Sequence, residues 1–214
     1  MTIDSIIFDL DGTLWDATDM VVKGWNKALE EYGQEHRLSI EPLTKEQVRK
    51  VMGLQIDEIA RRFFPQLSEE GRKVLMDKGC EIECRYLLED GGKPYPYVLE
   101  TLALLARKYK LFIVSNCQAG YIETFLAAHQ LEHYFADFEN PGRTGLSKAE
   151  NIKMVIERNN LQSPVYLGDT TGDGRAAHQA GIPFIYARYG FGDVEEYDAV
   201  IDSFQALPEV IEQW

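Results

Sequence analysis

The sequence has few basic residues, few cysteines and no long hydrophobic run. Lysine and arginine number 22 against 35 acidic residues, which gives a formal net charge of −13. Proteins that bind nucleic acid neutralise phosphates with clustered lysine and arginine, so a nucleic-acid partner is not expected. No apolar run approaches the about 18 residues of a membrane-spanning helix, and no signal peptide opens the chain. We therefore expect no membrane association and a cytoplasmic location.

Other common sites are also absent. The three cysteines do not form a disulfide framework, and Cys80 and Cys84, four positions apart in a helical pattern, predict two half-buried thiols on one helix face. The glycines of Gly190-Phe191-Gly192 are a lone pair with Glu195 where a dinucleotide-binding motif needs a third glycine. The histidines lack metal-ligand spacing: His36, His129, His133 and His178.

Short apolar runs that end in polar residues predict the strands. They cover residues 5–8, 111–114, 165–167 and 182–186. Each run is continuous instead of alternating, as expected of strands that are covered on both faces. Helical patterns separate the later runs, and Arg175 to Ala180 predicts a short helix that Gly181 ends. This alternation predicts an α/β fold with a doubly wound parallel sheet.

Residues 15–90 interrupt the alternation with helical patterns and no convincing strand. Thr44 and Gln47 form a capping box before one of these helices. We expect residues 15–90 to form an inserted α-helical cap domain, with residues 1–14 and 91–214 as the α/β core domain. The glycines and proline of residues 90–94 suit a return hinge.

Asp9 and Asp11 follow the first predicted strand and precede Gly12. Residues two apart at a strand exit can face the same side, so both carboxylates can meet one ligand, and Gly12 lets the backbone turn away sharply. One carboxylate can attack phosphorus, while the second can protonate a leaving oxygen. Alone, the same Asp-x-Asp-Gly pattern is more often an ordinary turn.

A second acidic cluster, Asp169 and Asp173, follows the third run. Carboxylate oxygens suit Mg²⁺, which takes one or two protein carboxylates together with phosphate oxygens and water. A calcium-binding loop of the helix-loop-helix type is excluded because Ala180 stands where that loop needs a glutamate. Because ligands of open parallel sheets bind beyond the carboxyl ends of strands, we expect this cluster to meet Asp9.

Two further segments can bind phosphate. Ser115 and Asn116 end the second run and open a helix, where a hydroxyl and free N–H groups can cradle an anion. Ordinary N-caps use the same residue types. Ser147 and Glu150 predict a capping box that places Lys148 in the first helical turn, where the helix dipole disfavours a cation. This placement favours a role for Lys148 in holding anions together.

These motifs together resemble those of the haloacid dehalogenase superfamily. Its Asp-x-Asp-Gly-Thr motif matches residues 9–13, its strand-ending Ser or Thr matches Ser115, and its Lys matches Lys148. Its Gly-Asp-x-x-x-Asp motif matches residues 168–173. The resemblance spans nearly the whole chain and implies the helical-cap subgroup, with phosphoglycolate phosphatase-like enzymes as the nearest comparison. Residues 116–147 leave no room for the larger cap type.

The resemblance implies a Mg²⁺-dependent phosphatase that hydrolyses a small phosphorylated metabolite through an aspartyl-phosphate. Asp9 would be the nucleophile, Asp11 the general acid and base, and Lys148 the third catalytic residue. The substrate-binding residues would be Ser115, Asn116 and Thr13. The metal-binding residues would be Asp9, Asp11 through its carbonyl, Asp169 and, as an outer or orienting group, Asp173.

Some alternatives stay open at this point. A β-phosphoglucomutase-like sugar-phosphate mutase shares all four motifs, and a non-catalytic phosphate or Mg²⁺ binding module is a further possibility. Ala149 replaces a frequent proline after the motif lysine, which leaves Arg143 as a rival to Lys148 for the phosphate. The chain would be a monomer or a dimer. Residues that could select the substrate are found in the predicted cap: Gly53, Leu54, Gln55, Arg61 and Arg62.

Overall fold

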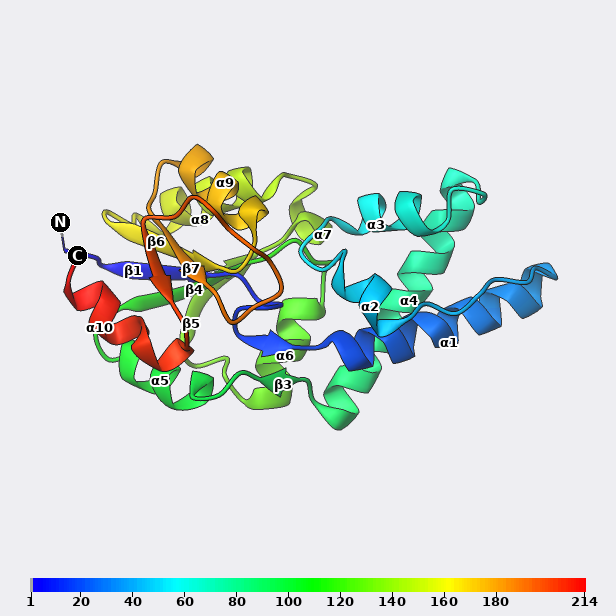
Figure 1. Cartoon of the computed structure of the whole chain (residues 1–214), viewed down its shortest axis with the longest axis horizontal. Helices are drawn as coiled ribbons and strands as arrows, with labels where there is room; N and C mark the ends of the chain where they lie inside the picture. Colours follow the sequence, from blue (N-terminus) through cyan, green and yellow to red (C-terminus); the bar gives the residue numbers. More distant parts are fainter. Residues whose placement is uncertain (1) are drawn as a thin grey trace.

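The computed structural model describes residues 2–214, and a six-stranded parallel sheet forms its centre (Figure 1). The strands lie in the order β5-β4-β1-β6-β7-β8. Their bounds are Ser5–Phe8 (β1), Lys110–Val114 (β4), Phe135–Glu139 (β5), Pro164–Gly168 (β6), Phe184–Ala187 (β7) and Ala199–Ile201 (β8). All five pairings in this sheet are parallel, so the predicted α/β fold class is confirmed.

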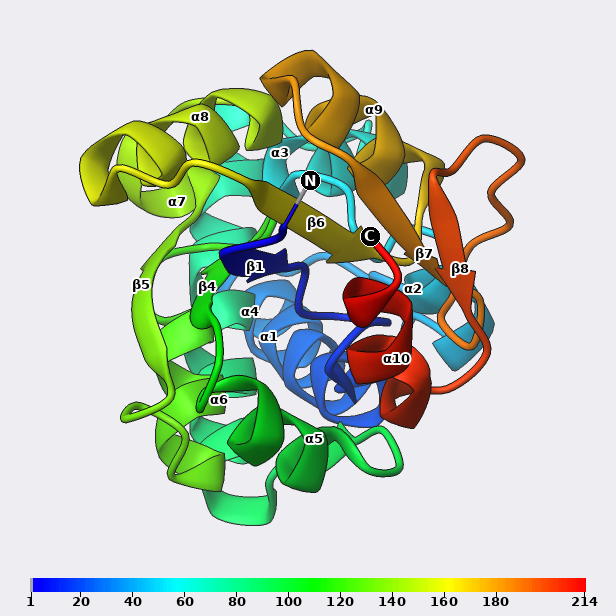
Figure 2. The ribbon, with the colours of Figure 1, turned by 90° about the vertical axis from the view of Figure 1, so that its left-hand side faces the viewer.

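Helices cover both faces of the sheet, as Figure 2 shows. One face carries α8 (Lys148–Asn159) and α9 (Thr171–Ala180), preceded by the short α7 (Pro141–Thr144). The other carries α5 (Val98–Leu105), α6 (Tyr121–His129), the 3₁₀ turn Phe204–Ala206 and α10 (Leu207–Glu212). Side chains of β1 alternate between the two layers, because Ile7 packs beneath α8 and α9 while Phe8 packs with Phe204. Burial on both faces explains the continuous apolar runs.

The remaining helices lie together beyond the carboxyl ends of the strands (Figure 1). They are α1 (Thr18–His36), α2 (Lys45–Arg49), α3 (Ile56–Phe63) and α4 (Glu69–Asp90). The long helices α1 and α4 pack tightly, since a Cβ on Gly24 would come within 2.7 Å of the Glu83 backbone. The short antiparallel strands β2 (Trp15–Asp16) and β3 (Lys93–Pro94) join these helices to the sheet.

Several local predictions agree with the structure and others do not. The capping boxes at Thr44 and Ser147 are both present, and Gly181 ends α9 at a φ of +81°. The expectation of no strand in residues 15–90 was wrong at Trp15–Asp16, and helix α9 begins four residues before Arg175. The division at residues 15–90 stays a prediction, which we keep because α1–α4 fall inside it. In residues 2–214 no helix has both the length and the apolarity that a membrane crossing requires.

Candidate active site

Adjacent strands deliver the predicted site residues to one edge of the sheet. Asp9 follows β1, Ser115 follows β4 and Asp169 follows β6, and β1 lies between the other two strands. Their carboxyl ends therefore open on the same side, toward the helices α1–α4. Convergence of distant segments follows here from the strand order alone.

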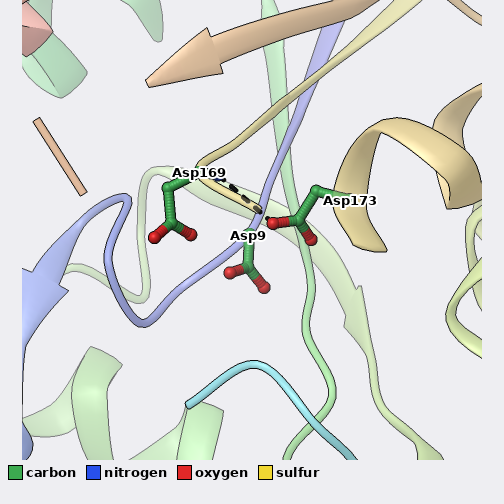
Figure 3. A group of neighbouring side chains, drawn as sticks. All are labelled: Asp9, Asp169 and Asp173. Carbon is green, nitrogen blue, oxygen red and sulfur yellow. Dashed lines mark hydrogen bonds between the residues drawn. The ribbon is translucent and has the colours of Figure 1, made fainter. Parts of the chain in front are cut away.

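Three buried carboxyl groups meet at this edge, and Figure 3 shows them turned toward one another. Each of Asp9, Asp169 and Asp173 offers an oxygen within 4.8 Å of the others. All are at most 1% exposed. Like charges at this separation, away from water, repel strongly unless cations or protons offset them.

Lys148 supplies a positive charge to this cluster. Its ammonium donates to Oδ1 of Asp9 at 2.9 Å and to Oδ1 of Asp173 at 2.6 Å. Because Lys148 is the first residue of α8, directly after the Ser147 cap, its side chain reaches the cluster from the helix start. Although burial opposes the charge, the carboxylates of Asp173 and Asp9 hold the pKa of Lys148 above its usual range.

Asp173 is fully engaged by protein donors. Its Oδ2 accepts from the backbone N–H groups of Asp169, at 3.2 Å, and Thr170, at 2.9 Å, and from the Thr170 hydroxyl at 2.7 Å. Its Oδ1 accepts from Lys148. An aspartate with both oxygens committed in this way is suited to orient Asp169 and Lys148, and less suited to bind an ion directly.

The carboxyl groups are held in an environment that disfavours their charge. Burial and the nearby charge of Asp173 raise the pKa of Asp9 to about 6, although Lys148 and Ser115 oppose the shift. Burial, Asp173 and Asp9 raise the pKa of Asp169 well above its usual range. At neutral pH the single positive charge of Lys148 therefore does not balance the negative charges that the carboxyl groups of the cluster would carry.

Asp11 lies at the side of this cluster that faces α1–α4. It is 8% exposed, and its Oδ1 accepts a hydrogen bond of 2.9 Å from the hydroxyl of Tyr121 on α6. Burial and the charge of Asp9 raise the pKa of Asp11 to about 8. At neutral pH this carboxyl thus holds a proton, which is the state that a general acid requires.

Glycines permit a very close approach of three loops around Asp169. A Cβ on Gly12 would lie 2.1 Å from Oδ2 of Asp169, and one on Gly190 would lie 2.3 Å from Cβ of the same residue. The backbone N–H of Phe191 donates to Oδ2 of Asp169 at 2.7 Å. Gly190-Phe191-Gly192, which carried no function as a sequence pattern, therefore forms part of the wall of the site.

The remaining predicted residues are placed unequally. Thr13 is buried, and its hydroxyl lies 3.5 Å from Oδ1 of Asp169. Ser115 lies close enough to Asp9 to oppose part of the rise in the pKa of the Asp9 carboxyl. Asn116 instead donates to the carbonyl of Gly53 at 3.0 Å, so it links the sheet edge to the segment before α3.

The rival cations do not enter the site. Arg143 is directed at Glu139, at 3.4 Å, and over the ring of Phe138. Lys148 is therefore the better placed of the two for a phosphate. Arg62 pairs with Glu58 on the outer surface of α3, and Arg61 lines a separate surface hollow.

Sequence patterns gave no signal for Tyr121, Glu83 and Gln118. Tyr121 bonds to Asp11, and Gln118 donates to Glu83 on α4. All three occupy ordinary helical or loop positions, and only tertiary packing brings them to Asp11. The prediction that Ser115 and Asn116 open a helix was wrong, because α6 begins only at Tyr121. The start of this helix is the sequence signal that could have found Tyr121.

The donor set fits Mg²⁺. The available atoms are hard carboxylate oxygens, supplied by Asp9 and Asp169. The backbone carbonyl of Asp11 follows two residues after Asp9 in the sequence. The raised pKa values of Asp9 and Asp169 indicate that the cluster can accept further positive charge.

A family model of haloacid dehalogenase-like hydrolases matches residues 6–187. The chain belongs to this family, as its motifs predicted. It is similar to the phosphoglycolate phosphatase of Aliivibrio fischeri, at 27% identity over 96% of this chain and 95% of the relative. It is 29% identical to that of Agrobacterium fabrum, over 94% and 89% respectively. Its fold matches a predicted phosphoglycolate phosphatase of Haemophilus somnus, with a TM-score of 0.83 at 23% identity over 98% of each chain.

Proposed function

We propose that this hydrolase is a Mg²⁺-dependent phosphatase that releases phosphate from a small phosphorylated metabolite through an aspartyl-phosphate on Asp9. The observation that carries the proposal is that carboxylate oxygens of Asp9, Asp169 and Asp173 lie within 4.8 Å of one another, with Lys148 bridging Asp9 and Asp173. The relatives described above are named phosphoglycolate phosphatases. Together with the family match, they confirm the prediction that this chain is a phosphatase of the haloacid dehalogenase-like family. The individual residue roles are part of the proposal.

Binding and attack follow from the arrangement around Asp9. Lys148 holds Oδ1 of Asp9 in place and supplies positive charge where a phosphoryl group would lie. Ser115, next to Asp9, offers a hydroxyl to a phosphoryl oxygen. A carboxylate oxygen of Asp9 forms a bond to phosphorus as the bond from phosphorus to the ester oxygen breaks.

Asp11 moves the protons. Its carboxyl, neutral at pH 7 through its raised pKa, gives a proton to the departing ester oxygen. The carboxylate that remains then takes a proton from water, whose oxygen attacks phosphorus and breaks the bond to Asp9. The hydroxyl of Tyr121 holds Asp11 in place for both transfers.

Mg²⁺ would be held by Asp9, the carbonyl of Asp11 and Asp169, with Asp173 orienting Asp169. When bound, Mg²⁺ neutralises charge on the phosphoryl group and on the carboxylates.

The proposal also includes the predicted cytoplasmic location and the predicted monomeric or dimeric state.

The test is release of phosphate from a panel of phosphorylated metabolites, ranked by kcat/KM with Mg²⁺ present. We expect release that a chelator abolishes and that added Mg²⁺ restores. Asp9→Asn should remove turnover while thermal unfolding shows an intact fold. Phosphate release that persists in Asp9→Asn refutes the assigned nucleophile. Isomerised sugar phosphate without net phosphate release would identify the mutase alternative.

A further inference from the structure

A small chamber lies next to Asp11, between the sheet edge and helices α1, α3 and α4. Its volume is about 40 Å³, which gives room for roughly three atoms of water size, at about 10–15 Å³ each. Asp11, Asn116 and Gln118 line it from the sheet side, and Trp25 and Glu83 line it from the helices. Most of its other wall consists of apolar side chains.

Two side-chain oxygens of this wall have no hydrogen-bond partner. Glu83 is 2% exposed; its Oε1 accepts from Gln118, while its Oε2 has no hydrogen-bond partner. The side-chain amide of Asn116 donates to the carbonyl of Gly53, while its Oδ1 also has no hydrogen-bond partner. A buried polar oxygen without a hydrogen-bond partner is costly, so these oxygens favour a ligand whose terminal group can hydrogen-bond to them.

Trp25 adds one donor to the same wall. Its indole N–H lies near the Glu83 carboxyl without reaching hydrogen-bond geometry. A hydroxyl can accept from this N–H while it donates to an acceptor, so the Trp25 N–H does not exclude donor-bearing ligands.

Within the described part of the chain, no cationic side chain lines the chamber or its entrance. A wider cleft of about 660 Å³ shares Asn116 and Gln118 with the chamber and leads to solvent. Its carboxyl groups are Asp57, Asp77 and Glu81, of which Asp77 pairs with Lys73. Across residues 2–214, the linings of both spaces include no lysine, arginine or histidine.

The wall also tolerates negative charge poorly. Burial raises the pKa of Glu83 to about 8, and the charge of Asp11 adds to the shift. A carboxylate brought in by a ligand would lie in the same desolvated space, and no counter-ion would offset its charge.

We propose that Glu83, with Asn116, makes this chamber select phosphate monoesters whose alcohol part is short and carries a hydroxyl or ammonium group and no carboxylate. The inference rests on the proposed phosphatase function. Because Asp11 gives its proton to the ester oxygen and also lines the chamber, the alcohol part extends from the phosphate into this space. The phosphoglycolate of the relatives' names carries a carboxylate at that position, so this chain differs from them in substrate class.

Three two-carbon esters test the proposal: 2-hydroxyethyl phosphate, ethanolamine phosphate and 2-phosphoglycolate. They share the phosphate and differ only in the terminal group, which is a hydroxyl, an ammonium or a carboxylate. With Mg²⁺ present, we expect kcat/KM for the first two to exceed that for 2-phosphoglycolate by about 100-fold, because the carboxylate of 2-phosphoglycolate would be desolvated without a counter-ion. The comparison of the first two identifies which donor the chamber prefers.

Glu83→Gln tests the residue. The amide keeps the shape and removes the acid, so the preference against 2-phosphoglycolate should shrink by about tenfold, mainly through KM. Glu89→Gln is the matched control, since Glu89 is exposed on the same helix and lines neither space. A Glu83→Gln variant that keeps the full preference overturns the role of Glu83.

The wild-type ranking decides the substrate class even where Glu83→Gln fails to fold. Hydrolysis of 2-phosphoglycolate at or above the efficiency of the other two esters overturns the proposal and leaves the phosphatase function intact. If none of the three esters releases phosphate while other phosphorylated metabolites of the panel do, the chamber proposal fails; if no member of the panel does, the phosphatase proposal fails. Calorimetric binding of the same esters to Asp9→Asn then tests the chamber directly, and tightest binding of 2-phosphoglycolate contradicts it.

Discussion

Replacement of Lys148 by methionine exposes how much this lysine stabilises the acidic cluster. Methionine keeps an unbranched side chain of similar length but removes the charge that bonds to Asp9 and Asp173 at 2.9 and 2.6 Å. All three side chains are at most 5% exposed. Removing one partner from a buried ion pair costs about 3–5 kcal/mol, because the other charges are left without compensation.

The sign of the pH dependence follows from the carboxyl groups. The pKa of Asp9 is raised to about 6 even beside Lys148, so the native state binds its proton more tightly than the unfolded state does. Stability therefore falls as pH rises through the range between the unfolded and folded pKa values. Without Lys148 this folded pKa rises further, and the deficit of Lys148→Met should be largest near pH 8 and shrink toward pH 5.

The assay is urea unfolding of wild type and Lys148→Met in chelator at several pH values, repeated with Mg²⁺. We expect a loss of about 3–5 kcal/mol near pH 8, partly recovered by Mg²⁺, which stabilises the state that binds it. Lys153→Met, exposed on the same helix, is the control and should change little. Equal stability of Lys148→Met and wild type near pH 8 would refute the electrostatic reasoning.

Two further substitutions test neighbouring parts of the site. Asp11→Asn should lower turnover of alkyl phosphates by about 10²–10⁴-fold, because the leaving oxygen then receives no proton. The leaving group of p-nitrophenyl phosphate needs no proton, so with this substrate the variant should give a stoichiometric burst of p-nitrophenol and then slow turnover. Steady turnover of p-nitrophenyl phosphate at the wild-type rate would contradict the role of Asp11 as acid and base. Gly190→Ala would place a Cβ 2.3 Å from Cβ of Asp169 and 2.4 Å from the carbonyl oxygen of Gly12. We therefore expect the free energy of unfolding to fall by about 1–3 kcal/mol and the Mg²⁺ concentration needed for activity to rise. Unchanged unfolding and Mg²⁺ titration curves would show that the loop does not form the wall of the site.

The sheet and its charged edge were predictable because local signals mark them. Asp9 and Asp169 directly follow apolar runs that are buried on both faces, so the strand ends and the carboxyl groups appear together in the sequence. Lys148 was predictable because a capping box fixes the start of its helix. Strand β5 was missed because only its end residues, Phe135 and Glu139, are buried, and an edge strand of this kind shows no apolar run.

The chamber beside Asp11 was not predictable for a different reason. Glu83 lies between Ile82 and Cys84 on α4, a helix with little amphipathic contrast, and nothing in its sequence separates this buried glutamate from the exposed Glu81. Its environment comes from the packing of α4 against α1 and from Gln118, which lies beyond β4. Contacts between segments far apart in the chain decide this part of the site, and short sequence patterns do not encode them.

The central claim is that Asp9 carries the phosphoryl group during turnover. The direct measurement is rapid acid quench of the enzyme with a phosphate ester and Mg²⁺, reduction of acyl phosphates with borohydride, and peptide mass spectrometry. The account predicts homoserine in place of Asp9, and none when Mg²⁺ is withheld. Reduction product at another carboxyl group, or at none during active turnover, would contradict it.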